Sequence, residues 1–160
     1  MSRRSMKKIL LDADASPVTK LVLSHCEAMS IPLTVVHSRD HVPRDGWPDW
    51  VDVHIVEAGP DAADFQLLAE CRRGDLVITG DIGLAALCIG RGAEVLQFKG
   101  DRIRPEELDM LLALRYETQK ARRRGKYGRG PSARSRDDDD RFARMLQTLT
   151  EAWSKGDGDV

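Results

Sequence analysis

The sequence predicts an α/β protein, a three-layer sandwich in which helices cover both faces of a mostly parallel sheet. Short apolar segments typical of buried strands alternate with segments whose apolar residues recur at spacings of three and four, which indicates helices packed on a sheet. The chain has 160 residues, of which 41% are apolar and 32% charged. This composition suits one folded core, and strands joined through helices imply right-handed crossovers.

The first half of the chain supplies three predicted strands and two predicted helices. Ser16 offers an N-cap hydroxyl and Pro17 suits the first helical position, so a helix should open there. Its apolar residues from Val18 to Met29 form one stripe. The elements expected in order are a strand over residues 8–12, this helix, strands over 31–36 and 51–56, and a helix from Pro60.

The second half repeats the alternation and then changes character. The expected elements are a strand over residues 75–81, a helix over 84–89, a last strand over 93–98, a helix from 105 to about 116, and a helix over 141–153 capped by the acidic run 137–140. We therefore divide the chain into an α/β domain over residues 1–118, a basic flexible strap over 119–136, and a C-terminal segment over 137–160 whose helix packs on the same domain.

Several classes of protein are excluded by composition. No run approaches the ~18 apolar residues of a transmembrane helix, and the basic N-terminus meets Asp12 too soon for a signal peptide. Three cysteines without C-x-x-C spacing do not favour a disulfide framework or a zinc site, and the four histidines lack metalloprotease spacing. A reducing cytoplasm is the expected location, and no membrane partner is expected.

Charge is distributed unevenly along the chain. Lys and Arg total 25 against 26 Asp and Glu, yet residues 115–136 hold nine basic residues and one acid. Basic side chains interleaved with glycine and one aromatic ring suit a flexible RNA-binding segment. The residues expected to bind nucleic acid are Arg122, Arg123, Arg124, Lys126, Tyr127 and Arg129. The alternative is a solvated linker neutralised by residues 137–140.

Carboxylates gather where the predicted strands end. Asp12 and Asp14 flank the end of the first strand, Asp81 ends the fourth, and Asp64 follows Asp61 in the first turn of the second helix. Open parallel sheets bind ligands at the carboxyl ends of strands, and convergent carboxylates imply a cation or a raised pKa. Ligation by oxygen alone favours Mg²⁺ or Mn²⁺ over zinc.

Structural roles compete with this interpretation for some of these residues. Asp61 and Asp64 could simply serve the N-terminus of their helix, and Asp75 reads as a turn residue. An apolar strand that ends in D-x-D is harder to explain structurally. Asp61, Ser16 and Thr79 are secondary candidates for the site. Asp61 lies one turn before Asp64, and the other two carry a hydroxyl close to the carboxylates in sequence.

Three segments carry a resemblance to a known family: LDADASPV at residues 11–18, DAAD at 61–64 and GDLVITGDIGLA at 74–85, with GP at 130–131 before DRF at 140–142. Together they resemble the YaiI/YqxD family of bacterial proteins, which is similar to PIN-like domains. The resemblance implies a PIN-like fold and a cluster of Asp12, Asp14, Asp64 and Asp81 that binds Mg²⁺ or Mn²⁺ for RNA hydrolysis. Ser16 stands where the family usually has Cys.

The function expected is therefore that of a metal-dependent phosphodiesterase acting on RNA, or on single-stranded DNA as the less favoured substrate. The four aspartates would hold one or two ions, and the strap would bind the backbone. One alternative is a phosphatase resembling the haloacid-dehalogenase class, with Asp12 as nucleophile and Asp14 as acid and base. Another is a non-catalytic RNA-binding protein.

Overall fold

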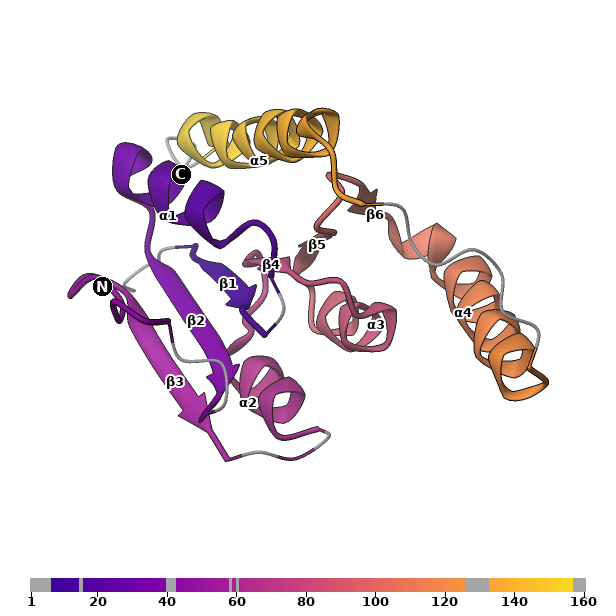
Figure 1. Cartoon of the computed structure of the whole chain (residues 1–160). Helices are drawn as coiled ribbons and strands as arrows, with labels where there is room; N and C mark the ends of the chain where they lie inside the picture. Colours follow the sequence, from indigo (N-terminus) through magenta and orange to yellow (C-terminus); the bar gives the residue numbers. More distant parts are fainter. Residues whose placement is uncertain are drawn as a thin grey trace.

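The computed structural model describes residues 7–14, 16–39, 43–57, 59, 61–125 and 133–156 (Figure 1). Within these ranges the chain forms six strands, five α-helices and a 3₁₀ turn, η2. In chain order they are β1 (Ile9–Asp12), α1 (Thr19–Met29), β2 (Leu33–Ser38), β3 (Asp52–Val56), α2 (Ala62–Glu70), β4 (Leu76–Ile78), α3 (Ile82–Gly90), β5 (Glu94–Leu96), β6 (Arg102–Ile103), η2 (Pro105–Glu107), α4 (Leu108–Arg123) and α5 (Arg136–Gly156).

The strands form one sheet in the order β3-β2-β1-β4-β5-β6. β1 pairs in parallel with both β2 and β4, so the chain builds the sheet outward on one side of β1 and then on the other. The carboxyl ends of β1 and β4 therefore mark the switch in strand order, where open α/β sheets bind ligands. The predicted, mostly parallel sheet is confirmed.

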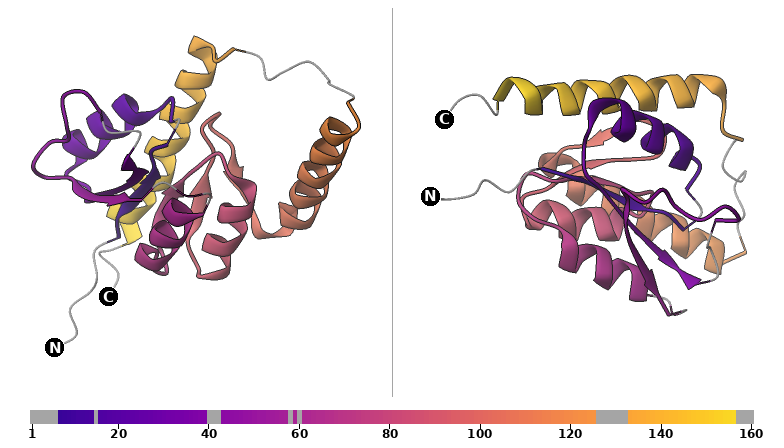
Figure 2. Two further views of the ribbon diagram at one scale, coloured as in Figure 1. Left: turned by 60° about the horizontal axis from the view of Figure 1, so that its bottom comes forward. Right: turned by 90° about the vertical axis from the view of Figure 1, so that its left-hand side faces the viewer.

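Two cores lie on opposite faces of this sheet, and they confirm the three-layer sandwich (Figure 2). Successive residues of a strand point to opposite faces. Leu11 thus packs with Val22 of α1 and Phe142 of α5, whereas Leu10 packs with Leu67 of α2 and with residues of α3. Cys26, Cys71 and Cys88 are buried free thiols.

The sheet has one strand that the sequence did not predict. β6 pairs antiparallel with β5 after a turn that includes Gly100, whose φ is +95°. The strand expected within residues 93–98 is present as β5, but the expectation that it is the last strand is wrong. A strand of two residues carries too little periodicity to be recognised from sequence.

Two helices have N-terminal caps that differ from those expected. α1 begins at Thr19, and the Ser16 hydroxyl accepts a hydrogen bond from the Val18 amide at 3.2 Å, so Ser16 and Pro17 form a turn before the helix. α5 begins at Arg136, and the acidic run lies in its first two turns. Ser135 caps it: its hydroxyl accepts from the Asp138 amide, and Asp138 accepts from the Ser135 amide.

Asp75 lies in the turn before β4, as expected, and its buried carboxylate also has a structural role. Only 2% of its surface is exposed. It pairs with the Lys8 ammonium at 2.9 Å and also accepts hydrogen bonds from the amides of Lys8 and Arg72. These bonds join the beginning of β1 to the beginning of β4 and place both strands in register for the site at their other ends.

α4 lies at the margin of the molecule, beyond β6 (Figures 1 and 2). None of its residues is fully buried. The helix extends to Arg123, so the predicted strap starts inside it. None of the helices in the described parts of the chain is both long and apolar enough to cross a membrane.

Candidate functional site

Asp12 is the central residue of the candidate site. It ends β1, and Thr79, directly after β4, donates a hydrogen bond from its hydroxyl to Asp12 Oδ2 at 2.8 Å. Burial raises the pKa of Asp12 to about 6, and the charges of Asp64, Asp14 and Asp81 raise it as well, against the lowering effect of the Thr79 hydrogen bond. The structure therefore brings the four predicted carboxylates into one electrostatic cluster.

Asp81 and Thr79 are linked by the turn that connects β4 to α3. Asp81 is the N-cap of α3, and its Oδ1 accepts a hydrogen bond from the Leu84 amide at 3.1 Å. The Thr79 hydroxyl accepts a hydrogen bond from the Asp81 amide at 3.0 Å while it donates to Asp12. Thr79, a secondary candidate in the sequence, thus binds the Asp12 carboxylate and the backbone of Asp81 at the same time.

Asp14 is oriented from the other neighbouring strand. Its Oδ1 accepts hydrogen bonds from the amide and the hydroxyl of Ser38, at 3.0 and 3.3 Å, at the last residue of β2. The D-x-D motif therefore places one carboxylate toward β4 and anchors the other against β2. Ser16, another secondary candidate, has its hydroxyl hydrogen-bonded within its own turn.

Asp64 approaches the cluster from the first turn of α2. Burial raises its pKa, the charges of Asp81 and Asp61 raise it further, and Arg115 opposes them. Asp61 occupies the N-cap position of α2, but its side chain makes no capping hydrogen bond. The side chain of Asp61 therefore does not cap α2.

The cluster opens onto a cavity of about 710 Å³. Its lining residues are Asp12, Asp14, Gly80, Asp81, Ile82, Phe98 and Arg115. Gly80 is required by close packing, because a Cβ there would lie 2.9 Å from Cδ2 of the Phe98 ring. Asp64 acts on the charges of the cluster without lining this cavity.

Arg115 and Phe98 are site residues that sequence reasoning missed. Arg115 Nη2 lies 3.9 Å from Asp81 Oδ1, and both side chains are partly exposed, so the pair is weak. Arg115 opens the basic stretch of the sequence, but its position depends on how α4 docks. No local sequence pattern indicates that α4 docks so that Arg115 reaches this cavity.

The basic residues of the strap do not all fall in described segments. Arg122 and Arg123 are exposed in the last turn of α4, and Arg124 is its exposed C-cap. Lys126, Tyr127 and Arg129 lie outside the described residues.

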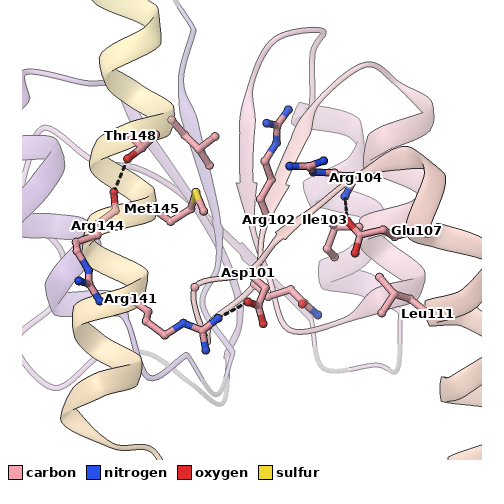
Figure 3. Close-up of a pocket in the computed structure, with 13 residues that line it drawn as sticks. Asp101, Arg102, Ile103, Arg104, Glu107, Leu111, Arg141, Arg144, Met145 and Thr148 are labelled. Carbon is pink, nitrogen blue, oxygen red and sulfur yellow. Dashed lines mark hydrogen bonds and ion pairs between the residues drawn. The ribbon is translucent and has the colours of Figure 1, made fainter.

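A second cavity of about 710 Å³ lies between β6, the beginning of α4 and the middle of α5 (Figure 3). Four arginines line it, Arg102 and Arg104 from the β6 segment and Arg141 and Arg144 from α5. Asp101 pairs with Arg141 across the opening. Gln97 and Gly100 line this cavity while Phe98 lines the first, so both cavities have lining residues in the loop after β5.

Comparison with known proteins gives the same family that the motifs resemble. A family model described as "Uncharacterized BCR, YaiI/YqxD family" matches residues 10–152. A UPF0178 protein of Clostridium acetobutylicum is 36% identical over 144 residues, which cover 89% of this chain and 95% of that protein. UPF0178 proteins of Bacillus cereus and Oceanobacillus iheyensis are each 34% identical, over 89% and 90% of this chain and 97% and 99% of their own lengths.

No solved structure gives a significant match to this chain. The matched segment runs from β1 into the second half of α5, and it contains each of the four clustered aspartates together with Thr79 and Arg115. The chain belongs to the YaiI/YqxD family.

Proposed function

We propose that this protein is a metal-dependent phosphodiesterase that hydrolyses RNA, with single-stranded DNA as the less favoured substrate. The observation that carries the proposal is the state of Asp12 at the switch in strand order: burial and three carboxylates together raise its pKa to about 6. Like charges brought together in this way are costly at neutral pH, and a bound divalent cation removes the cost.

The donor set fits Mg²⁺ or Mn²⁺. Asp12, Asp14 and Asp81 line one cavity with carboxylate oxygens, and Asp64 adds its charge from α2. Hard oxygen donors are those that these ions prefer. When bound, such an ion supplies Lewis acidity, lowers the pKa of a water molecule and neutralises charge on a phosphate.

The protein's own residues have separable tasks in this proposal. Thr79 holds one oxygen of Asp12, which leaves the other available to a ligand. Arg115 offers a guanidinium to a phosphate oxygen at the cavity wall, a geometry that suits phosphate recognition. The Phe98 ring packs against Gly80 and forms an apolar wall on which a base could stack.

A polymeric substrate is favoured by the second cavity. Its four arginines outnumber its acids, and both cavities have lining residues in the loop after β5. A nucleic-acid backbone that leaves the aspartate cluster past Phe98 would meet these arginines, whose binding to phosphates is electrostatic. A small phosphate ester would not need them.

The phosphatase alternative retains one supporting observation. Thr79 fixes Asp12 Oδ2 and so presents the remaining oxygen in a defined direction, as a nucleophilic carboxylate requires. Phosphatases of this kind use a lysine in the site, whereas the cation that lines this cavity is Arg115. The nuclease proposal therefore ranks first.

The test is cleavage of labelled single-stranded RNA and DNA by the purified chain after EDTA treatment, with Mg²⁺ or Mn²⁺ added back. We expect metal-dependent cleavage that Asp12→Asn abolishes and that Asp45→Asn, an exposed acid in the loop before β3, leaves unchanged. A phospho-enzyme mimic formed with beryllium fluoride at Asp12 would favour the phosphatase instead. RNA binding without turnover under either metal would contradict both enzymatic proposals.

A further inference from the structure

A second group of metal-ligating side chains lies outside the aspartate cluster, between the edge strand β3 and α2. Asp52 and His54 are two residues apart on β3 and so point to the same face. Glu70 is the last residue of α2, which packs on that face. His54 Nε2 lies 3.1 Å from Asp52 Oδ2 and 2.9 Å from Glu70 Oε1.

The three side chains present one nitrogen and two oxygens to a common point. One ligand atom from each lies within 4.8 Å of the other two. Atoms bonded to one tetrahedral Zn²⁺ at about 2.0–2.2 Å lie roughly 3.3 Å apart, so only small side-chain shifts separate this group from a metal-binding geometry. His54 and Glu70 are about one-third exposed or less, which leaves an open side for water ligands.

Neighbouring polar groups support two of these side chains from behind. Gln66, one turn before Glu70 on α2, has its side-chain amide 3.5 Å from His54 Nδ1. The Thr34 hydroxyl donates a hydrogen bond to Asp52 Oδ2 at 3.4 Å. Partners of this kind orient metal ligands. A ligating histidine usually donates its second ring N–H to an acceptor, and the oxygen of the Gln66 side-chain amide can take that role once the amide turns over.

We propose that Asp52, His54 and Glu70 bind a divalent transition metal of the Zn²⁺ type. The imidazole nitrogen favours Zn²⁺ or Co²⁺ over Mg²⁺, for which the all-oxygen aspartate cluster is the better match. This site shares no residue with that cluster and does not depend on the function proposed for it. The alternative for the same contacts is an ion pair between a protonated histidine and two carboxylates.

A metal here joins α2 to β3 at one end of the helix, and Asp64 lies near the other end. Glu70 and Asp64 are six residues apart, about 9 Å along a helix axis. Fixing Glu70 to the sheet therefore limits how far the Asp64 end of the same short helix can move. The proposed role of the ion is structural, and it acts on the orientation of α2.

The experiment is a titration with Co²⁺, followed by its visible absorption, on a parent variant that carries Asp12→Asn and Asp81→Asn. Those two changes weaken metal binding at the first cluster, so the remaining signal reports the second. We expect one ion per chain, displaced by Zn²⁺ but not by millimolar Mg²⁺. Zn²⁺ should also raise the melting temperature of this parent.

Three further variants in the same parent decide the assignment. His54→Gln and Glu70→Gln should each weaken Co²⁺ binding by at least about tenfold, since even second-shell partners contribute that much. Glu57→Gln, an exposed acid one residue beyond β3, is the matched control and should bind as the parent does. Binding that is absent from the parent, or equal in all three variants, would overturn the proposal and leave the group as an ion pair.

Discussion

Replacing Asp12 by Asn should make the metal-free protein more stable at neutral pH, although the same change abolishes the proposed activity. Burial and the neighbouring carboxylates raise the pKa of Asp12 from 3.8 to about 6. At about 1.4 kcal/mol per pKa unit, the ionised carboxylate costs the folded state about 3 kcal/mol. An amide of the same shape does not ionise and can still accept the hydrogen bond from Thr79.

The pH dependence follows from the direction of this shift. Because the pKa is higher in the folded than in the unfolded chain, the folded chain binds more protons between about pH 4 and pH 6. The stability of the wild type therefore falls across this window and stays lower above it. The gain in unfolding free energy from Asp12→Asn should be absent near pH 4 and should reach up to about 3 kcal/mol above pH 6. In a chain of this size each kcal/mol raises the melting temperature by about 2–4 °C.

The assay is urea unfolding in EDTA near pH 4 and near pH 7.5. Asp75→Asn is the matched control, because Asp75 is a buried carboxylate that pairs with Lys8 at 2.9 Å, and its loss should destabilise the protein. An Asp12→Asn variant that is less stable than the wild type near pH 7.5, or whose gain is the same at both pH values, would refute the argument that Asp12 is held at an electrostatic cost.

Three other predictions follow from the site and its surroundings. Ser16→Ala removes the acceptor of the Val18 amide and should cost about 0.5–1.5 kcal/mol in urea unfolding; an unchanged stability would show that this turn does not depend on the hydroxyl. Neutralising Arg122, Arg123 and Arg124 together should reduce the slope of log K for RNA against log salt by about two units. Turnover at saturating RNA should be preserved. An unchanged slope would make this segment a linker. Arg115→Ala should raise the pKa of Asp64 further, because Arg115 lowers it. The pH–rate profile for RNA cleavage should then move to higher pH. A profile that does not move would show that Arg115 has no electrostatic effect on the cluster.

The strand-end carboxylates could be predicted because their positions follow from local pattern and topology together. The apolar segments before Asp12 and Asp81 are short strands, and parallel strands joined through helices bring such ends to one edge. The sequence also places Asp64 in the first turn of a helix, and the crossover from β3 directs that turn to the same edge.

What could not be predicted depends on contacts between distant segments. Arg115 reaches the cavity only because α4 docks beside α3, and no pattern near residue 115 encodes that docking. His54 and Glu70 are 16 residues apart with no recognisable metal-binding spacing, and they meet because α2 packs on β3. The beginning of α5 was misplaced because Asp137 and the acids that follow it resemble a cap, whereas Ser135 is the residue that accepts the hydrogen bond.

The position of α5 has a consequence for how the chain folds as it is synthesised. Phe142 and Leu146 of α5 are at most 1% exposed, and they complete the core that Leu11 of β1 and Val22 of α1 begin. One face of the central strand therefore stays partly uncovered until α5 has been synthesised. Contacts this far apart in sequence slow folding. We expect nascent chains that stop before α5 to expose this apolar face and to need protection from aggregation until the last helix leaves the ribosome.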